Sequence, residues 1–306
     1  IIERIIDRSP KNGLGRTQIN KVFPKLIEKT SYMGCKPYNA AKVDEVFAGG
    51  KMGISEVKAD GRYSNAVISD NITELESRQG EEVLIGECTL IKELSQFPDC
   101  VLNGEFVIPQ FKREISNGIM TSIINITGKL NSEEAAEVAK GEASRDKLCA
   151  KYDIKYQDLL DSITYIVWDI DEYYANNPTS PRLERLARLE STVAIHNPTK
   201  INVVEYKFVY STEEALDHFI EKLALGEEGT VLKTADGLWR DGKKYTQIKM
   251  KVEFDLDLKV TGFNYGNEGT KNVNVISSVT CESEEGTLST RAHGIPEDLM
   301  GFITEN

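Results

Sequence analysis

The chain has 306 residues, 40% of them hydrophobic, and a formal net charge of −12 at pH 7. This length suits two domains with a fragment of a third, and the hydrophobic content is enough for packed cores, which excludes global disorder. The longest apolar runs are only as long as a β-strand, so no segment is expected to span a membrane as a helix.

Cysteine and histidine usage narrows the chemistry. The five cysteines are scattered without the paired spacing of a disulfide or zinc framework, which indicates free thiols in a reducing compartment and predicts a cytoplasmic protein. The three histidines, His196, His218 and His293, have no plausible metal partner close in sequence. Mechanisms in which a serine or cysteine nucleophile depends on histidine are therefore poorly supported.

The first thirty residues are predicted to be helical and basic. Helical stretches run up to Arg8 and from Thr17 to Lys29, with a break between them at residues 10–13. This segment holds seven Lys and Arg against three Asp and Glu, a local charge of 7 − 3 = +4, so the acidic net charge does not exclude phosphate binding. The chain opens with Ile1 and not with Met, and we expect it to begin inside a longer protein.

From about Lys36 onward, short β runs alternate with turns. The predicted strands are Ile54–Lys58, Tyr63–Ser69, Val101–Ile108, Tyr165–Ile170, Thr230–Lys233 and Tyr245–Lys251. Residues 131–151 are predicted to form a surface helical insertion, and Ser211 with Glu214 predicts the capped start of a helix that Gly226 stops. Beyond Val252, residues 257–263 and 272–279 alternate as in a small β-barrel, which is still open at Asn306.

The segment Glu56-Val57-Lys58-Ala59-Asp60-Gly61 is the first candidate for chemistry. A lysine at the end of a strand, followed by a tight Asp-Gly turn, projects a primary amine into a cleft. An amine attacks phosphorus only in its neutral form, which nearby positive charge or bound Mg²⁺ favours. The alternative is a surface hairpin with a solvated Lys58, because four residues of this type occur often by chance.

Further charged and aromatic side chains follow downstream, in the order Glu105, Trp168, Glu228, Lys233, Lys249 and Lys251. Glu105 is predicted to lie at the turn that ends a strand, and Trp168 in a buried strand. Lys249 and Lys251 share one face of a strand, because side chains alternate along it. Each of these alone has an ordinary structural explanation, as a turn carboxylate, a core aromatic or a solvated lysine.

Together and in this order, these segments resemble the covalent nucleotidyltransferase superfamily, which comprises ATP-dependent DNA ligases, RNA ligases and mRNA-capping enzymes. The resemblance is closest to DNA ligases of the T-even bacteriophage kind, through Lys58–Gly61, Val167–Asp169, Asp236–Trp239 and Asp255–Val260. The basic start, with Asn20–Pro24, is similar to the end of the DNA-binding domain that precedes the catalytic domain in such ligases.

The resemblance implies an α+β fold. A nucleotidyltransferase (adenylation) domain of antiparallel sheets with flanking helices would span residues 36–252. A remnant of a helical DNA-binding domain over residues 1–35 would precede it, and a partial OB-fold β-barrel over residues 253–306 would follow. The implied partner is nicked double-stranded DNA, bound by a monomer without membrane association, in the host cytoplasm if the source is a virus.

The resemblance also implies roles for individual residues. Lys58 would take AMP from ATP, with release of pyrophosphate, and pass it to the 5′-phosphate of a nick that the 3′-hydroxyl then closes. Trp168 would stack on adenine, and Glu56 would contact its edge. Glu105 would bind ribose or a metal, Glu228 would bind Mg²⁺, and Arg78 would bind a phosphate. Lys249 and Lys251 would contact the α-phosphate.

The chain departs from the family pattern in two places. The family has arginine at the sixth position of the nucleophile motif, where this chain has Tyr63. Arg62 stands one residue early, and neighbouring strand residues face opposite ways. The basic motif that ends the family's barrel is not found before Asn306, so truncation at both ends is expected.

Two alternatives stay open beside the DNA ligase. An RNA ligase or capping-type guanylyltransferase would share Lys58, the carboxylates and the last two lysines. A catalytically inactive DNA-binding homologue would share the basic helices. The phage-ligase-like segments favour the DNA ligase, and retention of the charged motif residues disfavours an inactive homologue.

Overall fold

A computed structural model of the whole chain describes residues 19, 21–23, 26, 32–171, 180–252, 256–268 and 272–305. The chain divides into two compact units, residues 1–251 and 252–306, and each is considered by itself. The two helices predicted before Lys29 fall largely outside the described residues. Among the described residues, no helix has both the length and the apolar character needed to cross a bilayer.

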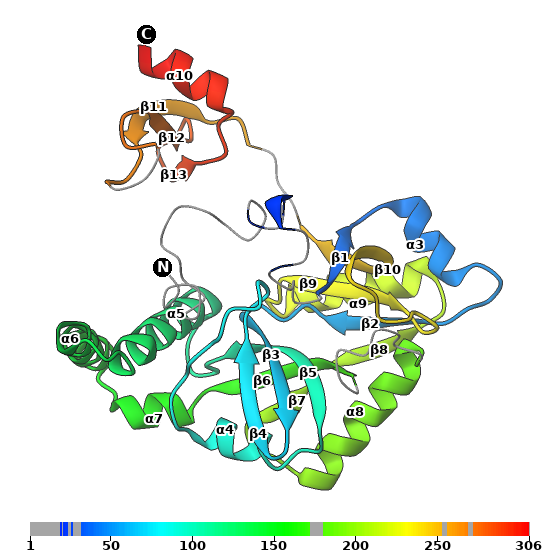
Figure 1. Cartoon of the computed structure of the whole chain (residues 1–306). Helices are drawn as coiled ribbons and strands as arrows, with labels where there is room; N and C mark the ends of the chain where they lie inside the picture. Colours follow the sequence, from blue (N-terminus) through cyan, green and yellow to red (C-terminus); the bar gives the residue numbers. More distant parts are fainter. Residues whose placement is uncertain are drawn as a thin grey trace. The chain divides into compact units, whose positions relative to one another are not determined.

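The first sheet of the larger unit contains the strands around Lys58. Its order is β1 (Met33–Pro37), β10 (Gly242–Lys251), β9 (Gly229–Thr234), β2 (Gly53–Val57) and β8 (Tyr206–Val209). Helices α3 (Ala40–Phe47) and α9 (Thr212–Ala224) pack against it (Figure 1). The core between them consists of Val43, Val46, Val209, Ala215, Leu232, Ile248 and Met250.

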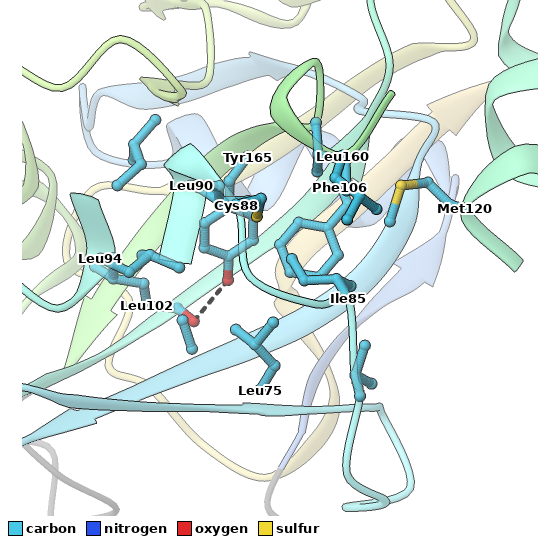
Figure 2. Packing of buried hydrophobic residues seen from close by; sticks show 14 of the residues in the cluster. Leu75, Ile85, Cys88, Leu90, Leu94, Leu102, Phe106, Met120, Leu160 and Tyr165 are labelled. Atoms are coloured by element: carbon cyan, nitrogen blue, oxygen red, sulfur yellow. Dashed lines mark hydrogen bonds between the residues drawn. The ribbon is translucent and has the colours of Figure 1, made fainter. Parts of the chain in front are cut away.

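The second sheet has the order β4 (Ile72–Glu76), β3 (Arg62–Ser69), β5 (Cys100–Val107), β6 (Thr164–Asp171) and β7 (Ile201–Val203). It shares a large core with α4 (Thr89–Leu94), α5 (Arg113–Leu130), α7 (Tyr156–Asp161) and α8 (Arg182–His196). Figure 2 shows part of this core, in which the Tyr165 hydroxyl donates to the carbonyl oxygen of Leu102 at 2.9 Å. A buried tyrosine is tolerated there because its hydroxyl has a partner.

The expectation of purely antiparallel sheets is wrong, because both sheets are mixed. β1 pairs with β10 in parallel, and β6 pairs with β7 in parallel, while the other neighbours are antiparallel. For β6 and β7 the cause is the connection: α8 lies between them in the chain, and a helical crossover returns the chain in the same direction. The α+β class itself is confirmed.

The six predicted strands of the larger unit are confirmed within one to three residues at each end. One detail is wrong: Glu105 does not lie at a turn. Strand β5 continues to Val107, so Glu105 lies inside it, opposite Tyr63 on β3 and Ile166 on β6. The asparagine and glycine before Glu105 are turn formers in general, but here both strands beside β5 continue past them.

Both predicted helices are also confirmed. The helical insertion is α6 (Ala135–Tyr152), which packs on α5. Helix α9 begins where Ser211 Oγ accepts the N–H of Glu214 at 3.1 Å, and Gly226 follows its end with φ of +87°.

The smaller unit contains β11 (Lys259–Tyr265), β12 (Ile276–Glu282) and β13 (Ser289–Ala292) as an antiparallel sheet, with α10 (Glu297–Glu305) against β12. The predicted run 257–263 corresponds to β11. The second strand begins later than predicted, at Ile276, and its buried residues are Ile276, Ser278 and Cys281. These strands are compatible with part of a barrel, and the OB-fold stays a prediction.

Candidate active site

Lys58 follows the last residue of β2 and is fixed against β9. Its backbone N–H donates to the carbonyl oxygen of Gly229 at 2.9 Å, and its Nζ forms an ion pair with Glu228. The antiparallel register, with Val57 opposite Thr230, brings the end of β2 to the start of β9, so the amine and the carboxylate meet. About a quarter of each side chain is exposed (24% and 28%), which leaves the pair accessible to a substrate.

Gly229 is required for this geometry. Its φ is +143°, and a Cβ at this position would lie 2.1 Å from the carbonyl oxygen of Met250 on β10. A residue with a side chain would therefore have to displace β10. Glycine permits the close approach of β9 and β10 that sets the direction in which Glu228 enters the site.

The turn after Lys58 is attached to the second sheet. The N–H of Gly61 donates to Glu105 Oε2 at 2.7 Å, and Asp60 lies 3.6 Å from Arg113 and 3.2 Å from Asn117, both on α5. Burial raises the pKa of the Glu105 carboxyl to about 7, against the opposing effects of the Gly61 N–H and of Lys58. Glu105 therefore titrates near neutral pH and lies within electrostatic range of Lys58.

We expect this pKa to appear in the pH dependence of stability. The unfolded carboxyl ionises near 4.5, whereas the folded protein keeps the proton up to about pH 7, so stability falls as pH rises through this window. Glu105→Gln removes the titration and keeps an acceptor for the Gly61 N–H. Relative to the wild type, its free energy of unfolding should rise by about 2 kcal/mol between pH 5 and pH 8, measured by urea denaturation without nucleotide or metal. A difference that stays constant with pH would contradict this expectation.

Trp168 lies at a β-bulge. In the register of β5 and β6, Asn103 faces Asp169 and the next residue, Gly104, faces Val167, so Trp168 has no partner on β5. Gly104 permits this local arrangement, since a Cβ there would lie 2.4 Å from the carbonyl oxygen of Ile166. A bulge re-aims a side chain relative to the regular pleat. The half-buried Trp168 ring lies 6.0 Å from the ring of Tyr63, centroid to centroid.

Glu56 is buried, with 2% of its side chain exposed, in an ion network that the sequence did not predict. Oε1 accepts from Arg182 Nη2 at 2.5 Å, and Oε2 accepts from Lys233 Nζ at 2.5 Å. Burial lowers the pKa of Lys233, and Glu56 opposes that effect. A second buried pair, Arg185 with Asp169 at 2.8 Å, adjoins this network. The two cations compensate the cost of burying the Glu56 carboxylate.

Arg78 and Tyr63 lie together. The exposed Arg78 guanidinium lies 4.6 Å from the ring centroid of Tyr32 and 5.4 Å from that of Tyr63. Tyr63, which stands at the position of the family's arginine, donates from its hydroxyl to Asn65 Oδ1 at 2.6 Å. Tyr63 thus lies between Arg78 and Trp168, while Arg62 is exposed. Because side chains alternate along β3, Arg62 faces the opposite way from Tyr63.

The two lysines near the end of β10 lie beside β9. Lys249 faces Val231, and Lys251 faces Gly229, the residue after Glu228. Cys35 on β1 lies within electrostatic range of three of the lysines. Burial raises the pKa of its half-buried thiol, and the positive charges of Lys233, Lys58 and Lys249 oppose this effect. The structure therefore places the residues predicted for the site on, or directly beside, neighbouring strands of the two sheets: Lys58, Glu56, Glu105, Arg78, Trp168, Glu228, Lys249 and Lys251.

Comparison with known proteins agrees with this arrangement. A family model described as the ATP dependent DNA ligase domain matches residues 33–251. The chain belongs to the ATP-dependent DNA ligase family. The DNA ligase of Enterobacteria phage T4 is 25% identical over 321 residues, which cover 98% of this chain and 64% of the phage protein. This chain thus spans less than two thirds of the length of that relative.

Two further ligases extend the comparison. The DNA ligase of Enterobacteria phage T3 is 32% identical over 104 residues, 34% of this chain and 30% of that protein. The structure of the ATP-dependent DNA ligase from bacteriophage T7 in complex with ATP aligns with a TM-score of 0.54 at 18% identity, over 90% of this chain and 85% of that one. At this identity the structural likeness supports the ligase fold alone.

Whether the site fits Mg²⁺ depends on which oxygen atoms its side chains can offer as ligands. Among the described residues, no group of three or more His, Cys, Asp and Glu side chains forms a ready-made metal cage. Mg²⁺ usually takes one or two protein carboxylates and completes its shell with water and substrate phosphate oxygens. Glu228, partly exposed beside Lys58, and Glu105 are the carboxylates that would hold Mg²⁺ in such a shared site.

The main residue of this candidate site that sequence reasoning missed is Arg182. A basic residue at the start of an amphipathic helix is ordinarily a solvated one, and Arg182 is buried only because Glu56, 126 residues earlier in the chain, compensates its charge. In the sequence, Lys233 is only the last residue of the predicted strand Thr230–Lys233, and no role follows from that position. The one signal in the sequence is the position of Glu56 inside the predicted strand Ile54–Lys58, where a buried carboxylate would need a cation.

Proposed function

We propose that this ligase-family chain seals nicks in duplex DNA through a lysyl-AMP intermediate on Lys58, with ATP as the AMP donor. The observation that supports this most directly is the position of the Lys58 amine: it is partly exposed at a strand end, paired with Glu228, and within electrostatic range of Glu105. Lysine is a nucleophile once it is deprotonated, and Lys58 is close enough to a carboxylate, Glu228, to pass it a proton.

The proposed reaction has three transfers at phosphorus. The neutral Lys58 amine attacks the α-phosphorus of ATP; an N–P bond forms, the bond to the bridging oxygen breaks, pyrophosphate leaves and the amine loses a proton. An oxygen of the 5′-phosphate at the nick then attacks the AMP phosphorus and displaces Lys58. Finally, the 3′-hydroxyl attacks the 5′-phosphate, which forms the phosphodiester and releases AMP. Lys249 and Lys251 would offset the negative charge that builds during transfer.

The remaining roles concern binding. We infer that Trp168 stacks on adenine, that Glu56 accepts from its 6-amino group, and that the exposed Arg78 guanidinium binds a phosphate. Glu56 has lone pairs left for another donor, because an ionised carboxylate accepts about four hydrogen bonds. The cation would be Mg²⁺, held by Glu228 and Glu105, which neutralises phosphate charge during attack.

The experiment is covalent labelling followed by transfer. The protein is incubated with α-labelled ATP or GTP, and the denatured protein is examined for a nucleotide adduct by mass spectrometry. We expect an AMP adduct on Lys58 that is discharged by nicked duplex DNA. Preferential labelling by GTP would indicate a capping-type enzyme. Discharge of the adduct by nicked RNA alone would indicate an RNA ligase. The absence of an adduct with either nucleotide would contradict the proposal.

Removing the Trp168 ring should weaken nucleotide binding more than it slows chemistry. Stacking is shared by the ground and transition states, so Trp168→Ala is expected to raise the KM for ATP about tenfold while kcat for adenylation changes less than about threefold. Trp168→Phe keeps a ring and should stay near the wild type. An equal loss in kcat with unchanged KM would exclude the stacking role.

Domain roles and partners belong to the same proposal. Residues 36–252 would form the adenylation domain, residues 1–35 part of a helical DNA-binding domain, and residues 253–306 part of an OB-fold barrel. The division of the chain after Lys251 supports the second boundary. We further infer a monomer that acts on nicked DNA in the cytoplasm of a host cell. The phage DNA ligases among the relatives support the DNA substrate and the host cell.

A further inference from the structure

Arg182 joins the two residues proposed to bind adenine. It is the first residue of α8, and 2% of its side chain is exposed. Nη2 donates to Glu56 Oε1 at 2.5 Å and to the carbonyl oxygen of Trp168 at 2.6 Å, and Nε lies 3.2 Å from the same carboxylate oxygen. Glu56 is on β2 of the first sheet and Trp168 on β6 of the second. One guanidinium therefore links the two sheets at the site.

Both acceptors depend on this contact. Trp168 is the extra residue of the bulge, without a partner on β5, and Arg182 satisfies its carbonyl oxygen. The Glu56 carboxylate is removed from water and needs a cation on each side, which Arg182 and Lys233 provide. A planar guanidinium fixes the direction of both acceptors at once, which a lysine ammonium does not.

The start of α8 is itself held firmly. The N–H of Leu183 donates to the carbonyl oxygen of Ala235 at 3.0 Å, and Pro181 forms an isolated β-bridge with Leu238. One turn along, Arg185 binds both carboxylate oxygens of Asp169, at 2.8 and 3.0 Å. These contacts fix the backbone of Arg182, so its guanidinium cannot simply follow a shift of Glu56 or Trp168.

Fold stability alone does not account for Arg182. Well-packed apolar residues often stabilise a core as well as, or better than, a buried ion network. Arg182 also lines a small pocket with Thr234 and Thr246, and its Nη1 has no hydrogen-bond partner within the described part of the chain. An unsatisfied buried donor is costly, so a charged group at this position indicates a requirement beyond packing.

We propose that Arg182 is a positioning residue for base selection: it aligns the Glu56 carboxylate with the plane set by Trp168, so that the site prefers a purine with an exocyclic amine at C6. This inference rests on the proposed function, in which Glu56 contacts the adenine edge. A misaligned carboxylate would still be negative, yet would lose the directional hydrogen bond that distinguishes adenine from a purine without that amine.

The test compares covalent labelling by ATP and by purine riboside triphosphate, which lacks the 6-amino group. In the wild type, the second-order rate constant for labelling should favour ATP by about tenfold or more, as for one lost hydrogen bond to a charged group. Arg182→Met should reduce this preference to within about threefold of unity. Arg182→Lys keeps the positive charge but lacks the planar guanidinium, so it should give an intermediate preference for ATP.

Arg185→Met is the matched control. It removes an equally buried guanidinium from the next turn of the same helix, and the hydrogen bonds of Arg185 go neither to Glu56 nor to the Trp168 carbonyl. Its melting temperature is expected to fall like that of Arg182→Met, while the preference for ATP stays at the wild-type value. If Arg182→Met does not fold, Arg182→Lys decides the question in its place.

Three outcomes separate the possibilities. Loss of the preference in the Arg182 variants alone supports the inference. An unchanged preference in those variants, at whatever absolute rate, overturns it, and so does a wild type that labels equally well with both nucleotides. Absence of any AMP adduct in the wild type would instead remove the proposed function on which the inference rests.

Discussion

Lys58→Arg is expected to reduce ATP-dependent labelling to background. Arginine stays protonated at every pH at which the protein is folded, so it has no lone pair to attack the α-phosphorus. The substitution keeps a positive charge opposite Glu228, with which Lys58 is paired. Because that pair is partly exposed, the free energy of unfolding should change by less than about 1 kcal/mol. The loss of labelling would therefore report on chemistry and not on folding.

Lys51→Arg is the control for this experiment. Lys51 also pairs with a carboxylate, Asp236, at 2.8 Å, but 59% of its side chain is exposed. The variant should label like the wild type. A covalent adenylate that persists in Lys58→Arg, attached to a different residue, would overturn the central assignment, and peptide mapping of the adduct would identify that residue.

The strands around the site could be predicted because each has a local pattern. Ile54–Lys58 and Thr230–Lys233 are short β runs bounded by turn residues, and the structure pairs them as β2 and β9. The order of the charged segments then indicated the family, which the match over residues 33–251 shows. What local pattern could not supply was the pairing register, and it is the register that brings Lys58 to Glu228.

Other features depended on long-range contacts. The bulge at Trp168 arises from the fit of β6 against β5, and the period of two that predicts the strand contains no sign of an extra residue. Glu105 was placed at a turn because Asn103 and Gly104 are typical turn residues, whereas pairing on both sides keeps β5 extended through them. The parallel pairing of β6 with β7 likewise follows from the helical connection between them and not from composition.

Substitution of Glu228 should separate binding from catalysis. Glu228→Gln keeps the shape of the side chain and removes the charge that we propose holds Mg²⁺ and that pairs with Lys58. A metal acts mainly on the charge that develops in the transition state, so adenylation should slow by about 10²- to 10³-fold while the Kd for ATP changes only a few-fold. Single-turnover labelling at saturating ATP measures the rate, and equilibrium dialysis measures the affinity.

Glu227→Gln supplies the matched control, because Glu227 is the exposed neighbour that precedes the start of β9. It loses the same charge one residue away, and its adenylation rate should stay within about twofold of the wild type. If Glu228→Gln instead loses binding and rate in equal proportion, Glu228 contributes to nucleotide affinity and not to transition-state stabilisation. Raising the Mg²⁺ concentration tests the same point. If Glu228 is a metal ligand, the rate of Glu228→Gln should recover in part, because a weakened site fills at higher Mg²⁺ concentration. If Glu228 acts only by pairing with Lys58, the rate should not recover.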